Sequence, residues 1–255
     1  MQLVEHPRGS YRFLTGIAPY SSGVIAMPDY EIVHVVLHPM LPYQAGFEMV
    51  DRFLAEVGRP RQALCAIQLR SPRPLSFEGF AAFNESYQVL LQKWDLWVDG
   101  LNPIARTNIV PAIRPPTEPS LFAFAYTRPT RDSDSVPTFI VAGAGDLVEQ
   151  RLSPDAIVRA GETSVDALRE KAATVMATMQ ARLDGLQVGW ADVTTVDVYT
   201  IHILQPHLTA TILGVMRPST LHDVHWFYSR PPIIDVEFEM DMRGVRHEIR
   251  LPTTR

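Results

Sequence analysis

One arginine stands out because apolar residues surround it, although its side chain must still find an anion or water. Arg106 lies near the start of "NPIARTNIV" (residues 102–110), a run that is typical of a core strand. A planar guanidinium donates two parallel hydrogen bonds to a carboxylate, which fixes both the charge and the orientation of a bound acid. The pattern leaves two interpretations open, carboxylate binding or an unpaired surface arginine at a strand start.

Acidic residues near the carboxyl-terminal end of the sequence offer a second kind of chemistry. In "IDVEFEMDM" (residues 234–242), Asp235, Glu237, Glu239 and Asp241 alternate with apolar residues. This alternation is typical of an antiparallel strand with one solvated, acidic face. A carboxylate withdrawn from water could instead act as a general base, because burial raises its pKa toward neutrality. The pattern leaves both interpretations open.

The histidines and the cysteine do not have the spacing of a metal site. On a strand, His222 and His225 face opposite sides, so we expect them to share no metal. His222 alone could bind an anion or carry a proton. Cys65 lies in an apolar strand pattern, which predicts a buried, inert thiol. The sequence has no phosphate loop, GxSxG or HExxH motif, and we predict neither metal nor cofactor.

The elements that must position these side chains recur in similar order along the chain. The first half predicts strands over 11–17, 31–39, 63–71 and, as a pair, 102–127, and helices over 46–58 and 76–98. The second half predicts strands over 138–146, 191–203, 221–230 and 233–243, helices over 164–186 and 206–216, and a final hairpin arm over 245–252. Apolar residues at helical spacing or at alternate positions carry these assignments, and Ser76 is the expected N-cap of its helix.

A polar segment bracketed by prolines separates the two halves. Residues 129–137 ("PTRDSDSVP") are charged and lack apolar periodicity, which is typical of a linker. We predict an N-terminal domain over 1–128 and a C-terminal domain over 138–255, each with ββαβαββ order. Antiparallel or mixed sheets with helices on one face fit this order better than a doubly wound sheet, so the predicted fold class is α+β.

Composition excludes several classes of partner. The chain has 255 residues and a formal net charge of −5 without a basic block, so nucleic acid is not an expected partner. One cysteine permits no intrachain disulfide. No signal-peptide pattern and no apolar run of about 20 residues is present, so we expect a cytoplasmic protein without a membrane partner.

Five segments, in order, resemble the RidA/YjgF family of enamine/imine deaminases. They match that family's IGPY turn, its F-x-x-x-N-x-x-Y helix, its P-A-R-T/S strand, its strand ending in S-G-Q and its closing V-E-I-E-A-I-A strand. The matching segments are "GIAPYSSGV", "FAAFNESYQVLL", "NPIARTNIV", "FIVAGAGDL" and "DVEFEMDM". The resemblance covers most of the chain as two tandem copies, and it implies a RidA-like, chorismate-mutase-like fold for each half.

The resemblance also implies roles for individual residues. In the family, an arginine binds the substrate carboxylate, and a glutamate fifteen residues later positions water for attack on a C=N carbon, after which ammonia leaves. The first half matches the arginine with Arg106, the tyrosine of the turn with Tyr20 and the helix asparagine with Asn84. The second half matches the glutamate with Glu237 and the strand glycine with Gly143.

Each half departs from the family's pattern where the other half keeps it. The glutamate position of the first half falls at about Phe122, and the arginine position of the second half falls at His222. Asn108 stands where many relatives carry a cysteine. If both halves line one cleft, Arg106 and Glu237 complete a site between them. If they lie in different clefts, the chemistry has changed or is lost.

The resemblance thus predicts a hydrolytic deaminase that acts on an enamine or imine of a small carboxylate-bearing metabolite, such as an aminomuconate, and releases ammonia. Arg106 and Glu237 are the expected catalytic residues, and the expected substrate-binding residues are Arg106, Tyr20, Asn84, Asn108, Gly143 and His222. A homo-oligomer, as a trimer or a pseudo-hexameric assembly, is expected. Two alternatives stay open: chorismatase-like cleavage of an enolpyruvyl carboxylate, and a non-catalytic protein that binds carboxylate metabolites.

Overall fold

The computed structural model describes residues 1–130, 136–148, 151–216 and 224–253. Strands occupy Leu3–His6 (β1), Tyr11–Leu14 (β2), Gly23–Ala26 (β3), Tyr30–Pro42 (β4), Leu64–Arg70 (β5), Ala105–Pro111 (β6), Ser120–Pro129 (β7), Phe139–Gly145 (β8), Thr195–Thr200 (β9), His225–Arg230 (β10), Glu239–Gly244 (β11) and His247–Pro252 (β12). Helices occupy Tyr43–Glu56 (α1), Phe77–Lys93 (α2), Val165–Leu186 (α3), Gln205–His207 (α4) and Gly214–Met216 (α5), with a π-helical turn at Leu208–Leu213. Within these residues, no helix has the length and apolar character needed to cross a bilayer.

The predicted α+β class is confirmed, and the strands form one mixed sheet in the order β1-β2-β3-β8-β11-β9-β10-β6-β5-β7-β4-β12. The same pairing occurs twice within it. In the first half, β5 runs parallel to β6 and antiparallel to β7, and β7 pairs with β4. In the second half, β9 runs parallel to β10 and antiparallel to β11, and β11 pairs with β8. Strands β6 and β10 pair antiparallel and join the two sets.

Each half also contributes one strand that pairs with a strand of the other half. Strand β3 pairs antiparallel with β8, and β12 pairs parallel with β4. The hairpin expected for residues 245–252 is therefore wrong. Both edges of β11 are already paired, with β8 and β9, so no edge remains there for a hairpin partner. Ile249 and Leu251 instead pack against the apolar cluster of the first half.

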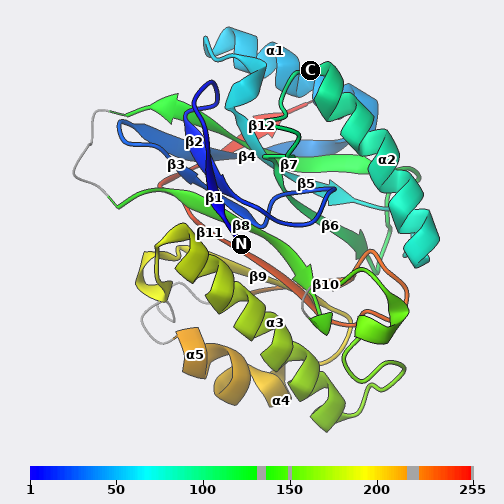
Figure 1. Cartoon of the computed structure of the whole chain (residues 1–255). Coiled ribbons are helices and arrows are strands. Elements are labelled where there is room, and N and C mark those ends of the chain that lie inside the picture. Colours follow the sequence, from blue (N-terminus) through cyan, green and yellow to red (C-terminus); the bar gives the residue numbers. More distant parts are fainter. Residues whose placement is uncertain (131–135, 149–150, 217–223, 254–255) are drawn as a thin grey trace.

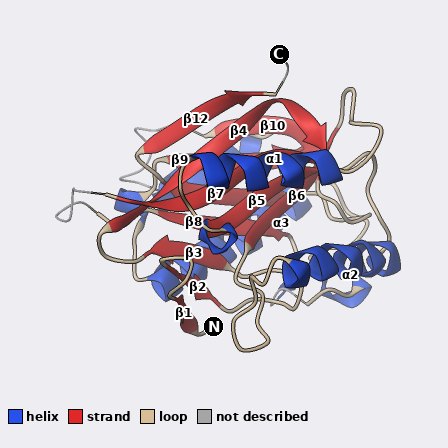
Figure 2. Ribbon diagram, turned by 90° about the horizontal axis from the view of Figure 1, so that it is seen from above, coloured by secondary structure: helices blue, strands red, loops and turns tan. Residues whose placement is uncertain are grey.

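The helices lie on the outer faces of the folded sheet, as Figures 1 and 2 show, with α1 and α2 over the first half and α3 over the second. Apolar periodicity explains this arrangement, because the stripe on α3 that the spacing predicts is entirely buried, at Leu168, Ala172, Val175, Met179, Leu183 and Leu186. Ser76 and Ser164 cap α2 and α3 by accepting hydrogen bonds from the backbone N–H of Gly79 and Ala167. The inner faces of the two halves then meet, and the functional side chains lie there.

Candidate active site

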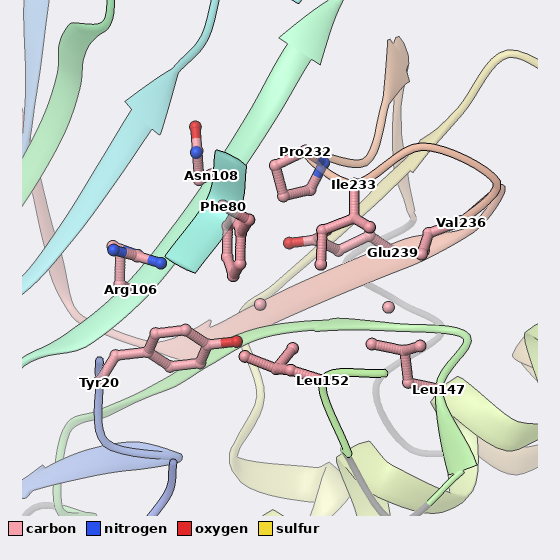
Figure 3. Close-up of a pocket in the computed structure, with 12 residues that line it drawn as sticks. Tyr20, Phe80, Arg106, Asn108, Leu147, Leu152, Pro232, Ile233, Val236 and Glu239 are labelled. Carbon is pink, nitrogen blue, oxygen red and sulfur yellow. The ribbon is translucent and has the colours of Figure 1, made fainter. Parts of the chain in front are cut away.

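A small cavity lies between the two halves. The first half contributes β6, α2 and the turn after β2, and the second half contributes β8, β11 and the loop before β11 (Figure 3). The lining residues are Tyr20, Phe80, Arg106, Asn108, Gly143, Gly145, Leu147, Leu152, Pro232, Ile233, Val236 and Glu239. The lining is mostly apolar, with few polar side chains that can orient a ligand.

Arg106 is buried in this lining with part of its guanidinium unpaired. It is 2% exposed, and Nη2 donates to Asn84 Oδ1 at 2.7 Å. Nη1 is buried and has no hydrogen-bond partner within the described part of the chain. Burial lowers the pKa of the Arg106 guanidinium, since charge is unfavourable away from water. Four rings lie 4.8–5.7 Å from it, those of Tyr20, Phe80, Phe83 and Tyr87.

Further hydrogen-bond donors without partners surround this guanidinium. Among the described residues, buried polar atoms that lack a partner include Asn84 Nδ2, Tyr87 Oη and Tyr43 Oη. Asn84 is itself 2% exposed on the inner side of α2, and its amide oxygen fixes the position of the Arg106 guanidinium by accepting a hydrogen bond from it. A buried cation among free donors is unfavourable in an empty site, and an anionic ligand would satisfy it.

Tyr20 reaches the cavity from a turn that is fastened to the strand carrying Arg106. The turn closes through the Tyr20 N–H donating to Ile17 O at 3.1 Å. Asn102 Nδ2 then donates to Pro19 O at 2.7 Å and ties the turn to the segment just before β6. Burial raises the pKa of Tyr20, so its hydroxyl keeps a proton that it can donate into the cavity.

Asn108 lies two residues beyond Arg106, so both side chains project from the same face of β6. Its Oδ1 accepts a hydrogen bond from Ser71 Oγ at 2.9 Å, which fixes the orientation of the amide. Its Nδ2 is buried and has no partner within the described residues. Asn108 therefore presents a second free donor to a ligand held by Arg106.

Glu239 is the carboxyl group that faces Arg106 across the cavity (Figure 3). It is 5% exposed, at the first position of β11. Burial raises the pKa of Glu239 to about 8, and a negative charge on Asp241 adds to this effect, against the opposing charges of Arg106 and Arg182. A carboxyl group that titrates near neutrality can both donate and accept a proton during a reaction.

Glu237, the glutamate selected from the sequence, is not among the residues that line this cavity. It precedes β11, and its Oε2 lies 2.7 Å from His202 Nε2. The solvated acidic face considered for this segment is wrong for Glu239 and Asp241, because both are buried between the halves. The predicted strand begins too early, because residues 234–235 form a turn and residues 236–238 are not part of a strand.

Other residues singled out in the sequence lie as follows. Gly143 lines the cavity on β8, opposite Glu239. His222 lies outside the described residues. Phe122, at the glutamate position of the first half, packs against the guanidinium of Arg70, whose central carbon is 4.0 Å from the ring centroid. Cys65 is buried and its thiol is free, as predicted.

A family model described as "2-aminomuconate deaminase CnbZ" matches residues 3–249. The chain belongs to this family. It is 39% identical over 246 residues to the 2-amino-5-chloromuconate deaminase of Comamonas testosteroni, covering 94% of this chain and 95% of that protein.

Solved structures resemble the chain much less. A chorismatase aligns over 88% of this chain and 77% of its own, with 13% identity and a TM-score of 0.44. A YjgF-family protein of Neisseria meningitidis aligns over 49% of this chain and 98% of its own, with 16% identity and a TM-score of 0.22. Similarity at this level supports no inference about activity.

A buried ion pair in this deaminase-family chain holds Glu239 in place, and the sequence analysis missed it. Asp146 and Lys171 are fully buried, with Lys171 Nζ donating to Asp146 Oδ2 at 2.7 Å. Asp146 Oδ1 accepts from the backbone N–H groups of Glu237 and Phe238, directly before Glu239. A lysine on the buried side of α3 was the available signal, because a buried lysine requires a partner.

Gly143 is required by the close approach of Glu239 to β8. A Cβ at this position would lie 2.4 Å from Glu239 Oε1 and 3.2 Å from Thr107 Cα. Strand β8 cannot easily retreat, because Arg182 Nη1 donates to Ala142 O at 2.6 Å and to Gly143 O at 3.3 Å. The carboxyl group would therefore have to move.

We expect Gly143→Ala to lower kcat by about 100-fold, since a displacement of about 1 Å at a reacting group costs that much. Steady-state ammonia release checks this result. Gly189→Ala is the matched control, because a Cβ there would meet only Asp192 Oδ2, at 3.9 Å. Wild-type kcat in Gly143→Ala would show that Glu239 does not need this space.

Proposed function

We propose that the chain is a hydrolytic deaminase of 2-aminomuconate-like enamines, which it converts to the 2-oxo acid and ammonia. Membership of the 2-aminomuconate deaminase family and the 39% identical relative support the substrate class. The buried Nη1 of Arg106, which has no hydrogen-bond partner among the described residues, is the observation that carries the proposal at the level of the site. Such a group is costly without a partner, and a substrate carboxylate supplies one.

The first step is the binding of the carboxylate next to the carbon that carries nitrogen. Arg106 accommodates this carboxylate, which brings the C–N carbon between the guanidinium and Glu239. A muconate has a second carboxylate at its other end. We assign the free Nδ2 of Asn108 and the hydroxyl of Tyr20 as donors to the substrate, with Asn84 holding the guanidinium from behind.

The chemistry then needs one group that gives and takes a proton, and Glu239 takes this role in place of Glu237. Protonated Glu239 donates to a carbon of the conjugated chain, which converts the enamine C=C–NH₂ to the iminium C=NH₂⁺. Its carboxylate next accepts a proton from water as the water oxygen adds to the C–N carbon. Return of that proton to nitrogen lets ammonia leave, and the hydroxyl proton passes to Glu239 as C=O forms, so enamine and water become oxo acid and ammonia and Glu239 is protonated again.

We further propose that the two halves are diverged copies of one RidA-like unit, divided at residues 129–137. The recurrence of the same strand pairing in β4–β7 and β8–β11 supports this. On this proposal, one complete site combines the arginine of the first copy with a carboxyl group of the second. A homo-oligomeric assembly and a cytoplasmic location stay predictions.

The test is to generate 2-aminomuconate in situ, and to measure ammonia release and loss of the substrate's absorbance together. We expect an acceleration of about 100-fold or more over the spontaneous reaction, with one ammonia per substrate consumed. Pyruvate release from chorismate would instead support the chorismatase-like alternative. Saturable binding of 2-aminomuconate without ammonia release would support a binding protein and would contradict the deaminase.

A further inference from the structure

Strand β11, which carries Glu239, has two buried faces of opposite character. Met240 and Met242 point into the apolar core beneath α3. Glu239, Asp241 and Arg243 alternate with them and are also buried, between the two halves of the sheet. The proposed acid and base therefore shares its strand face with a second carboxyl group that the mechanism above does not use.

Asp241 lies in the middle of this face, where neutral donors hold it. Its Oδ2 accepts hydrogen bonds from the Tyr199 hydroxyl at 3.1 Å and from Gln68 Nε2 at 3.0 Å. The strand register places Asp241 directly opposite Asp197 of β9. Two carboxylates directly opposite one another repel, so one of them must acquire a cation or a proton.

Asp197 is the carboxylate that acquires the cations. It accepts a hydrogen bond from Arg243 Nη1 at 2.7 Å, and its other oxygen lies 3.1 Å from His225 Nδ1. Burial opposes ionisation of Asp197, but the hydrogen bond from His225 and the charge of Arg243 outweigh it and lower the pKa to about 2. Burial, and then the charge of Asp197, raises the pKa of Asp241 to about 7.

We propose that Asp241 is a positioning residue for the reaction, which keeps the proton on Glu239 until an enamine binds. The two side chains are two residues apart on one buried strand face, where a negative charge on Asp241 opposes a negative charge on Glu239. The proposal rests on the role of Glu239 as the acid that protonates the enamine.

Charged groups from several elements face this pair and compete with the effect. Besides Asp241, the groups whose charges act on the pKa of Glu239 are Arg106 of β6, Arg182 of α3 and Asp146 after β8. The charge of Glu239 in turn acts on Tyr20. Those that act on Asp241 are Asp197, Arg243 and Arg70, together with a hydrogen bond from Thr107. Both cations that face Glu239 favour its anion, and burial, together with the negative charges of Asp241 and Asp146, opposes them.

Titration of the carboxyl groups by ¹³C NMR, without substrate, tests the coupling directly. The Glu239 resonance is identified by its absence in Glu239→Gln. In Asp241→Asn, we expect the titration midpoint of Glu239 to fall by about one pH unit. Tyr199→Phe removes a donor to Asp241 without changing any charge, and it should shift that midpoint much less. An unchanged midpoint in folded Asp241→Asn overturns the proposal.

The pH dependence of kcat/KM for 2-aminomuconate provides the functional readout. Wild type should lose activity as Glu239 loses its proton, with a midpoint near pH 8. In Asp241→Asn that limb moves to lower pH, so kcat/KM falls about fivefold at pH 8 and stays within about twofold of wild type at pH 6. A uniform loss at every pH would indicate a purely structural role and contradict the proposal.

Two further outcomes are informative. If Asp241→Asn does not fold, the wild-type titration decides alone: the Glu239 curve should show an inflection near pH 7, where Asp241 ionises, and a single-step curve overturns the proposal. If wild type releases no ammonia, the proposed function fails, while the NMR titration still determines whether Asp241 acts on Glu239.

Discussion

Replacing Arg106 by methionine is expected to lower kcat/KM for 2-aminomuconate by about 1,000-fold. Loss of one partner from a buried, hydrogen-bonded charge pair costs about 4 kcal/mol, and each 1.4 kcal/mol is a factor of ten. Nη1 and the bond to Asn84 both disappear in this variant, so the substrate carboxylate loses its cationic partner. Steady-state kinetics of ammonia release measure the loss.

The same substitution should leave the fold intact. Replacing a buried charge by an apolar side chain of similar volume is often neutral or stabilising by about 1–4 kcal/mol. We therefore expect the thermal unfolding midpoint of Arg106→Met to equal or exceed that of wild type. Arg106→Lys, which keeps the charge but loses the planar fork, should recover only part of the activity. A wild-type kcat/KM in folded Arg106→Met would contradict this role, because the substrate carboxylate would then bind somewhere other than at Arg106.

Exchanging Glu239 for glutamine is expected to lower kcat by about 1,000-fold, with a much smaller change in KM. Glutamine keeps the shape of the side chain but can neither give nor take a proton, which both the protonation of the enamine and the addition of water require. The matched comparison is Glu237→Gln, two residues upstream on the same segment. Its carboxylate contacts His202 rather than the cavity, so we expect kcat within about threefold of wild type.

These two glutamine variants discriminate between two ways of locating the catalytic glutamate. If Glu237→Gln were the inactive one, the fifteen-residue spacing from the family resemblance would be the better guide. Loss of activity in both variants would indicate that Glu237→Gln disturbs the backbone that Asp146 holds. Asp146 Oδ1 accepts hydrogen bonds from the backbone N–H groups of Glu237 and Phe238, so a distortion of these residues would displace Glu239. Thermal unfolding of each variant separates that case from loss of chemistry.

The sequence was sufficient for features that depend on local pattern. The stripe on α3 and the serine cap of α2 are local, so periodicity and residue type predicted them. Arg106 could be found because a charged side chain in an apolar strand must reach either an anion or water. Gly143 was selected through the family resemblance, and the close approach of Glu239 explains why a glycine is needed there.

Features that depend on contacts between the halves could not be predicted. Strands β1 and β3 have four residues each. Strand β3 pairs with β8, which lies more than a hundred residues later in the chain. The same limit concealed Glu239, because its burial arises where strands of the two halves meet. Counting residues from the family pattern selected Glu237, which would share a face with Glu239 only if the strand began earlier than it does.

The exchange of strands between the halves has a consequence for how the chain folds. The sheet of the second half needs β3 from near the amino terminus, and β4 remains an open edge until β12, at the opposite end of the chain, pairs with it. Contacts of such long sequence separation slow folding, since the entropy of closing a large loop is lost before the contacts form. During synthesis, the first half therefore waits with an unpaired strand edge until β12 has left the ribosome.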